Sequence, residues 1–323
     1  MSRRRATLLA VLAALLCVGC APRMTKALPE EDKPSAVEVL PEDEPPAAEA
    51  MAEEPAPLRE WWTVPVFAHG MGAVDGRMGT NSKDAFLANY AAGHRVFEVD
   101  FQLTSDGRLV ARHDWEQISY YNLEQTYVGV MDYDTFMHTP ICYFYTPLDF
   151  EGVVALLQEH SDVCLVTDSK DTDEPTVRAQ LREMTRVIDA AGDPTLWERV
   201  VLQIYSEEMY DWAREETGAT QFIFTLYQIA DPDYDAIGAF CEERGISVVA
   251  TARERLNKST AEALHAHGLR YYVHPVNRVL DMIAMSWAAD GYYSDYVKPE
   301  QFTAACSGTS RLYLAEENEL DTQ

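Results

Sequence analysis

Two histidines and a pair of carboxylates are the residues of this sequence best suited to chemistry. His69 follows an apolar run, and His113 ends a later one. Between them, Glu98 and Asp100 lie two residues apart in a strand-like run. Strand residues two apart share a face, so both carboxylates point the same way, and burying them without a cation is costly. The spacing therefore indicates a site that offsets negative charge with a metal ion or a base.

A third carboxylate and a cation follow another apolar run. Asp168 and Lys170 are also two residues apart and share a face. Three carboxylates without a sulfur ligand suit a hard cation, so we expect calcium or magnesium at Glu98, Asp100 and Asp168. The alternative is a salt-bridged loop in which Lys170 pairs with Asp168 or with Glu98.

Two polar residues are further candidates for contact with a substrate. Asn81 precedes Asp84 by three residues, a spacing typical of a helix cap, and a contact with the site would be an additional role. Gln203 lies near the end of an apolar run, where it lines a pocket or satisfies a backbone group. The aromatic-rich segment 120–145 either packs in the core or covers a bound head group.

The elements that must position these residues alternate regularly. Strand-like runs lie at residues 64–68, 96–102, 109–113, 163–167, 200–204, 222–226, 247–250, 270–273 and 291–294. Helical patterns lie at residues 82–92, 149–159, 174–191, 207–216, 232–243, 260–267 and 278–288. This alternation predicts a single-domain (β/α)₈ TIM barrel, in which active sites form at the carboxyl ends of the strands. The run 109–113 follows an Asp-Gly turn signal and is either a short addition beside the second strand or a barrel strand.

The start of the chain has the pattern of an export signal. Residues 1–20 carry three arginines at positions 3–5 and continue with an apolar run too short to span a bilayer. The run ends at Cys20, in a sequence that resembles the bacterial lipoprotein cleavage motif. That resemblance implies lipidation of Cys20 and anchoring to the outer face of the bacterial cell membrane. The alternative is a plain signal peptide.

Composition divides the rest of the chain. Residues 21–60 hold 8 of the 16 prolines and 11 acidic against 4 basic residues, which predicts a disordered acidic tether. We expect the barrel at residues 61–305 and an acidic tail at residues 306–323. The net charge of −27 argues against a nucleic-acid partner and against binding anionic lipid by charge alone.

The cysteines beyond the signal are too widely spaced for a metal-binding pair. They either include one disulfide or are four separate thiols. The residues in question are Cys142, Cys164, Cys241 and Cys306.

The motifs, taken in order, resemble the glycerophosphodiester phosphodiesterase family of the phosphatidylinositol-specific phospholipase C-like superfamily. The resemblance rests on the segments AHGMG, TNSKDAF, FEVDFQLTSDGRLVARHDW, VTDSK, VVLQIYS, VHPVN and DGYYSDY. It implies a TIM barrel that hydrolyses phosphodiesters. It places the metal ligands on Glu98, Asp100 and Asp168, and the catalytic acid and base on His69 and His113. Lys170 matches the lysine that follows the third ligand.

Three positions depart from the family pattern. Gly70 and Met71 stand where the pattern has Arg-Gly, so a phosphate-binding arginine is missing. Thr80 replaces a glutamate, and Asp168 replaces the usual glutamate ligand. These departures leave the reaction class unchanged, so we expect a metal-dependent phosphodiesterase that acts on small phosphodiesters or lipid head groups. The alternatives are a phospholipase C-like or sphingomyelinase D-like enzyme on the same barrel, or a non-catalytic surface binding protein.

Overall fold

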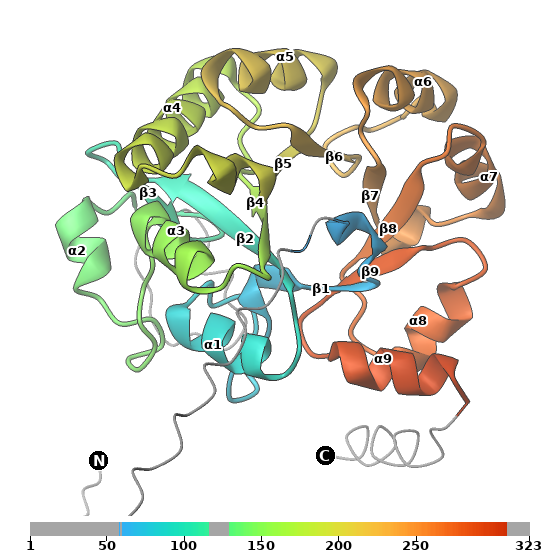
Figure 1. Ribbon diagram of the computed structural model, residues 1–323, viewed down its shortest axis with the longest axis horizontal. Coiled ribbons are helices and arrows are strands. Elements are labelled where there is room, and N and C mark those ends of the chain that lie inside the picture. The colour runs from blue at the N-terminus through green and yellow to red at the C-terminus, as the bar shows by residue number, and fades with distance from the viewer. Residues whose placement is uncertain (1–57, 59, 116–128, 309–323) are drawn as a thin grey trace, which may run out of the picture. The chain divides into compact units, whose positions relative to one another are not determined.

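Eight parallel strands close into a ring, and the expected alternation of strands and helices is confirmed (Figure 1). The computed structural model describes residues 58, 60–115 and 129–308. The expected export signal with Cys20, nearly all of the tether and most of the acidic tail lie outside the described residues, as does the stretch 116–128. Within the described residues, no helix is both long enough and apolar enough to cross a bilayer.

The strands follow the predicted order closely. They are β1 Val66–Ala68, β2 Val96–Leu103, β3 Leu109–Ala111, β4 Cys164–Asp168, β5 Val200–Ile204, β6 Gln221–Thr225, β7 Val248–Ala252, β8 Arg270–His274 and β9 Gly291–Ser294. The sheet runs in the order β1-β9-β8-β7-β6-β5-β4-β2-β3, and a further pairing of β1 with β2 closes the barrel. The ring neighbours pair in parallel, whereas β3 pairs antiparallel with β2 and lies outside the closed ring. The run at 109–113 is therefore an addition beside the second strand.

The helices surround the strands (Figure 1). They are α1 Lys83–Ala91, α2 Tyr133–Met137, α3 Phe150–Glu159, α4 Glu174–Ala191, α5 Glu207–Glu216, α6 Tyr234–Arg244, α7 Lys258–Ala266, α8 Val279–Met285 and α9 Pro299–Cys306. Four 3₁₀ turns accompany them, η1 Trp61–Thr63, η2 His69–Met71, η3 Pro194–Glu198 and η4 Arg253–Arg255. Two helices were not predicted: α2 is short, and α9 ends one residue beyond the limit of 305 that we expected for the barrel.

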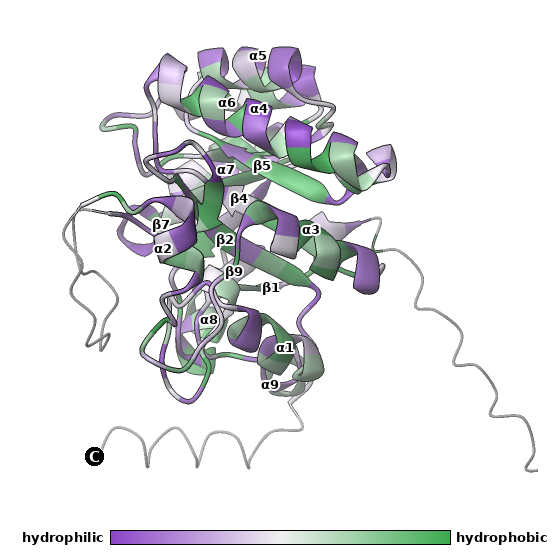
Figure 2. Cartoon of the chain, turned by 90° about the vertical axis from the view of Figure 1, so that its left-hand side faces the viewer, coloured by the Kyte–Doolittle hydropathy of each residue, from purple (hydrophilic) through white to green (hydrophobic). Residues whose placement is uncertain are grey.

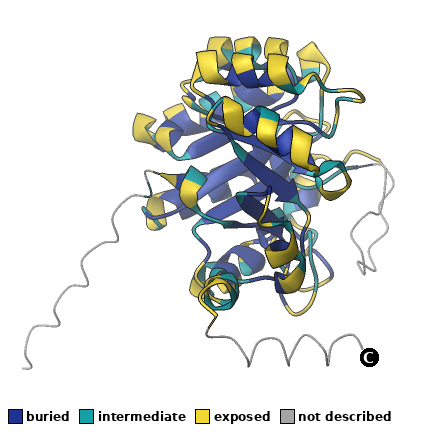
Figure 3. Ribbon diagram, turned by 90° about the vertical axis from the view of Figure 1, so that its right-hand side faces the viewer, coloured by how far each residue is buried: buried dark blue, intermediate teal, exposed yellow. Residues whose placement is uncertain are grey.

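Helix α4 shows why these segments are helical and how they pack. Asp173 accepts a hydrogen bond from the backbone nitrogen of Thr176 and caps the first turn, and Gly192, at φ +70°, ends the helix in the left-handed region. Its buried residues recur at helical spacing, which places one apolar face against the barrel. The helices accordingly have hydrophobic inner and hydrophilic outer faces, whereas the strands are almost entirely buried (Figures 2 and 3).

The two faces of β2 carry different residues, as the alternation predicts. Phe97 faces outward and packs on Phe86 of α1, with 4.6 Å between the ring centroids. Val96 faces inward and joins a buried cluster inside the barrel. Trp61 of η1 belongs to the same interior cluster and donates a hydrogen bond from Nε1 to Gln221 Oε1 at 3.1 Å. Because Gln221 begins β6, Trp61 lies at the amino-terminal end of the barrel, away from the carboxyl ends of the strands.

The four cysteines are separate thiols with no disulfide between them, so the disulfide alternative is wrong. Three are buried, and the fourth, in α9, is exposed. The residues are Cys142, Cys164, Cys241 and Cys306. Burial raises the pKa of the thiols of Cys164 and Cys241 to about 12, so both behave as inert core residues.

Candidate active site

Three carboxylates meet inside the carboxyl end of the barrel. Glu98 and Asp100 lie on the inner face of β2, and Asp168 ends the neighbouring strand β4 directly beside Asp100 in the register. All three residues are at most 5% exposed. One carboxylate oxygen from each lies within 4.8 Å of the others, an arrangement that can hold a single cation. The predicted carboxylate cluster is therefore present.

Lys170 offsets part of this negative charge. Its Nζ lies 2.6 Å from Asp100 Oδ1 and also forms an ion pair with Asp168. Burial would lower the pKa of Lys170, but the two carboxylates outweigh burial and raise it well above its ordinary value. The pKa of Asp100 is lowered: burial would raise it, but Lys170 and the two histidines outweigh that effect. The salt bridge that was the alternative from the sequence thus forms between Lys170 and Asp168, and Asp100 is a second partner of Lys170.

Glu98 has an oxygen without a partner. Its Oε2 accepts a hydrogen bond of 2.6 Å from the backbone nitrogen of Gly70, whereas Oε1 is buried with no hydrogen-bond partner among the described residues. Burial and the nearby Asp100 raise the pKa of Glu98 to about 8. A buried, unpartnered carboxylate oxygen beside two further carboxylates fits a divalent cation, so the donor set is consistent with the calcium or magnesium that we expected.

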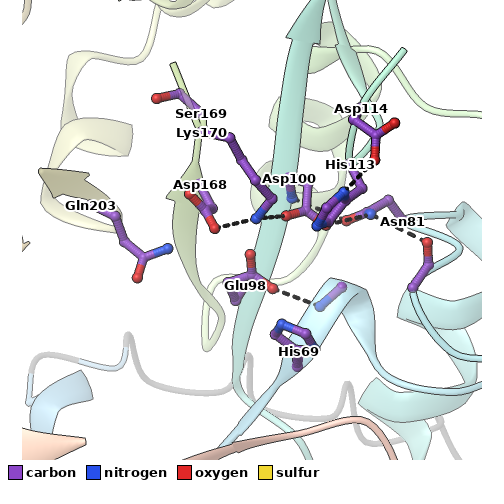
Figure 4. A network of polar contacts seen from close by, with 12 residues as sticks. His69, Asn81, Glu98, Asp100, His113, Asp114, Asp168, Ser169, Lys170 and Gln203 are labelled. Atoms are coloured by element: carbon purple, nitrogen blue, oxygen red, sulfur yellow. Dashed lines mark hydrogen bonds and ion pairs between the residues drawn. The ribbon is translucent and has the colours of Figure 1, made fainter. Parts of the chain in front are cut away.

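The backbone contact to Glu98 requires a glycine. Gly70 lies at φ +54°, in the left-handed region, and a Cβ placed on it would come within 3.0 Å of Gly79 Cα. The tight turn points its N–H at Glu98 (Figure 4). An arginine here, as in the family pattern, would have to adopt a strained backbone conformation.

His69 is oriented by a carboxylate from the far end of the sequence. Its Nδ1 lies 2.9 Å from Oδ1 of Asp295, which follows β9. Asn277, which follows β8, donates from Nδ2 to Asp295 Oδ2 at 2.7 Å and accepts from the Asp295 backbone nitrogen at 2.8 Å. Burial would lower the pKa of His69, but Glu98 and Asp295 outweigh it and raise the pKa to about 9. This network leaves Nε2 of His69 as the nitrogen free to meet a substrate.

His113 reaches the site through the antiparallel hairpin. Strand β3 runs back along β2, and the backbone nitrogen of Arg112 donates to the carbonyl oxygen of Asp100 at 2.9 Å. The next residue, His113, has its Nδ1 2.7 Å from Asp114 Oδ2. Figure 4 shows His69 beside Glu98 and His113 beside Asp100. Of the two alternatives for the run at 109–113, the short addition beside the second strand is the one that forms, and His113 follows it.

Asn81 holds a carboxylate and does not cap the helix. Ser82 is the cap of α1, since its Oγ accepts from the backbone nitrogen of Ala85 at 3.2 Å. Asn81, at φ +48°, donates from Nδ2 to Asp100 Oδ2 at 2.9 Å and accepts from the Asp100 backbone nitrogen at 3.1 Å. The cap prediction is wrong by one residue. The result is that Asn81 fixes the orientation of Asp100.

Gln203 lines a small cavity beside the carboxylates. Its Oε1 accepts hydrogen bonds from Thr225 Oγ1 at 3.0 Å and from the Tyr293 hydroxyl at 3.2 Å. Its amide nitrogen is turned toward Asp168 and Glu98 (Figure 4). The cavity is small: the centre of a water-sized group has about 10 Å³ in which to lie. Its walls are formed by His69, Glu98, Asp168, Gln203, Tyr227, His274 and Tyr293.

A sequence model of the Glycerophosphoryl diester phosphodiesterase family matches residues 73–298. The chain belongs to this family. The match spans most of the barrel, so the protein is a hydrolase of the glycerophosphoryl diester phosphodiesterase family with the TIM-barrel fold. The match to the family model begins after His69, so this histidine lies outside the matched residues.

Solved structures of similar proteins support the fold. A glycerophosphodiester phosphodiesterase from Parabacteroides distasonis is 15% identical with a TM-score of 0.58, and the likeness covers 76% of this chain and 98% of that one. A phosphodiesterase from Oleispira antarctica, solved with sn-glycerol-3-phosphate, is 14% identical with a TM-score of 0.60 and the same coverage. A glycerophosphodiester phosphodiesterase from Agrobacterium tumefaciens is 17% identical with a TM-score of 0.54, and the likeness covers 75% of this chain and 99% of the other.

Four residues, among others in the candidate site, were not assigned from the sequence. Asp295 and Asn277 orient His69, and Tyr227 and His274 line the cavity. Three of them lie in or beside the segments VHPVN and DGYYSDY, which carried the family resemblance but gave no role to individual residues. The signal that could have identified these residues is their position after strand-like runs, because residues that follow the strands of a barrel lie close together.

Proposed function

We propose that this protein is a metal-dependent phosphodiesterase that hydrolyses small phosphodiesters with glycerol or other polyol head groups, including those derived from lipids. The observation that carries the proposal is the arrangement around Glu98. Two histidines, each with Nδ1 on a carboxylate, lie beside three buried carboxylates, one of which has an unpartnered oxygen. Phosphodiester hydrolysis needs charge stabilisation, a base and an acid, and this arrangement offers all three.

The cation would be held by Glu98, Asp100 and Asp168. Hard carboxylate oxygens favour calcium or magnesium. Bound there, a divalent cation would stabilise the negative charge that develops on the phosphoryl oxygens. Asn81 keeps Asp100 oriented through two hydrogen bonds, and Lys170 adds a positive charge at the edge of the cluster.

The histidines would move the protons. His69 and His113 each engage a carboxylate through Nδ1, and Nε2 of each would exchange a proton with the substrate. One acts as the base that takes a proton from the attacking hydroxyl, and the other protonates the oxygen of the leaving alcohol. With water as the nucleophile, the phosphorus–oxygen bond to that alcohol breaks, and the products are a phosphomonoester and the free alcohol.

The substrate is proposed from chemistry and from one relative. The Oleispira antarctica phosphodiesterase was solved with the product sn-glycerol-3-phosphate, and we propose that the carboxylate cluster and the two histidines here take a phosphoryl group of the same kind. Lys170, Asn81 and Gln203 are the proposed contacts around it. Lys170 contributes charge, and Gln203 is on β5, which pairs with β4, so its amide nitrogen faces the carboxylates from the adjacent wall.

A panel of phosphodiesters assayed with and without a chelator tests this proposal. We expect release of an alcohol from a glycerophosphodiester, loss of activity in EDTA, and recovery with calcium or magnesium. Activity that is insensitive to EDTA would instead indicate a metal-independent, phospholipase C-like enzyme. Choline release from sphingomyelin would indicate a sphingomyelinase D-like enzyme. Absence of hydrolysis across the whole panel would refute catalysis and leave a binding protein.

Export and anchoring are a separate proposal. We infer from the arginine-rich start, the apolar run and Cys20 that the protein is exported and lipid-anchored, with the acidic tether between anchor and barrel. Mass spectrometry of the mature protein should find an amino terminus at Cys20 that carries a lipid. An unmodified terminus at Met1 would refute export through this segment.

A further inference from the structure

A third histidine faces the same cavity. His274 is the last residue of β8, and its ring lines the cavity together with Glu98, Asp168 and Gln203. In the closed ring, β8 and β4 are four strands apart in either direction, so His274 lies across the barrel from Asp168. It is therefore on the wall opposite the carboxylate cluster.

The ring of His274 is held in place but leaves one nitrogen without a partner. It packs edge-to-face on Tyr227 and Tyr293, with centroid distances of 5.9 and 5.7 Å. Its Nε2 is buried and has no hydrogen-bond partner among the described residues. Leaving a buried polar atom unpaired is costly, so such atoms in native structures usually have a ligand, an ion or a water to meet.

The cavity is otherwise short of groups that could bind a phosphoryl oxygen. Lys170 is already paired with Asp100 and Asp168. Gly70 occupies the position of the arginine in the family pattern, and the side chain of Met71 is 1% exposed within the apolar core. Among the described residues that form the cavity walls there is no arginine or lysine. A phosphoryl oxygen that enters this water-sized cavity needs a donor from the wall that faces the carboxylates.

We propose that His274 is a substrate-binding residue that donates a hydrogen bond from Nε2 to a phosphoryl oxygen. The inference rests on the proposed function, because it assigns a contact within that site. Burial lowers the pKa of His274 to about 4, so the imidazole is neutral and can donate without adding charge. Gln203 assists from the adjacent wall, since Tyr293 and Thr225 hold its oxygen and leave its amide nitrogen facing the cavity.

The test compares His274→Phe, which removes the donor and keeps an aromatic ring, with His274→Gln, which retains an N–H. Binding of sn-glycerol-3-phosphate is measured by calorimetry in saturating calcium, together with calcium affinity and the melting temperature. His138→Phe, at an exposed histidine that follows α2, is the matched control. We expect His274→Phe to weaken phosphate binding by about tenfold or more, the effect of losing one buried hydrogen bond to a charged group. Calcium affinity should not change.

His274→Gln should recover most of the binding, and the control should bind as the unaltered protein does. The inference is overturned if His274→Phe binds the probe as tightly as the unaltered protein. It is also overturned if His274→Gln is as weak as His274→Phe while both variants melt normally, since shape rather than a hydrogen bond would then decide affinity. Should His274→Phe fail to fold, the comparison of His274→Gln with His274→Leu replaces it.

Failure of this inference can be told apart from failure of the proposed function. Binding that depends on His274 in a protein that hydrolyses nothing would refute the catalytic proposal alone. Hydrolysis that His274→Phe leaves unchanged in KM and kcat, with unchanged binding, would refute the His274 contact alone. A protein that does not bind sn-glycerol-3-phosphate at all would refute the phosphoryl contact directly.

Discussion

Asp295→Asn is the most informative single change, because it alters which ring nitrogen of His69 carries the proton and leaves the side chain at position 295 the same size. Asn277 Nδ2 donates to Asp295 Oδ2 at 2.7 Å, so a carboxamide in this position must keep its oxygen toward Asn277. Its NH₂ group would then face Nδ1 of His69, which now lies 2.9 Å from Asp295 Oδ1. An NH₂ donor forces Nδ1 to accept, and the proton moves to Nε2. His69 would present the wrong tautomer for a base and would lose its stabilising carboxylate as an acid.

The size of the effect follows from this geometry. Asp295 is 4% exposed, so solvent does little to screen its charge from His69. Losing an orienting carboxylate of this kind lowers catalysis by about 100-fold or more, which corresponds to about 2.7 kcal/mol of transition-state stabilisation. The fold should tolerate the change, because the backbone of Asp295 stays anchored through Asn277 and Ala73. We therefore expect kcat to fall while KM, calcium affinity and melting temperature change little.

Steady-state hydrolysis of a glycerophosphodiester across pH measures this effect. Asp290→Asn is the matched control, because Asp290 Oδ2 lies 2.8 Å from Nε2 of His265 in a pair outside the site. The control should retain activity within about threefold of the unaltered protein. If Asp295→Asn keeps that activity with an unchanged pH profile, the orienting role of Asp295 is wrong. If both variants lose activity and melt early, the aspartates are structural.

The remaining predictions concern the cation, the histidines and one helix cap. His69→Ala and His113→Ala should each abolish hydrolysis and leave calcium binding by calorimetry nearly intact, since they remove proton transfer only. Asp100→Ala should remove calcium binding and activity together; full activity in EDTA would contradict the metal-dependent reading. Calcium at about 100 times its Kd should stabilise the protein by about 2.7 kcal/mol and raise Tm by several degrees in calorimetry, whereas an unchanged Tm would make the carboxylates structural. Ser82→Ala should lower the free energy of unfolding by about 1 kcal/mol, because it removes the cap of α1; urea unfolding measures this loss. A loss smaller than the experimental error would mean that Ser82 does not cap α1 and would favour Asn81 as the cap.

Local pattern accounts for what could be predicted from the sequence. The period of two in β2 placed Glu98 and Asp100 on one face, and the same spacing placed Asp168 with Lys170. Strands and most helices were found because each carries its own periodicity and flanking turns, which depend on neighbours a few residues away. The carboxyl ends of parallel strands meet in a barrel, so the convergence of the site followed from the fold class.

Contacts between distant segments were decided only by the tertiary structure. His69 and Asp295 are 226 residues apart and meet because β1 pairs with β9 when the ring closes. His113 reaches Asp100 because β3 turns back along β2, which the Asp-Gly signal permitted but did not determine. The choice of Ser82 over Asn81 as the cap, and the unpartnered nitrogen of His274, likewise depend on what packs opposite each side chain. The periodicity of the sequence indicates which way a side chain points. The residue that it contacts is decided by the strand order and the register across the closed barrel.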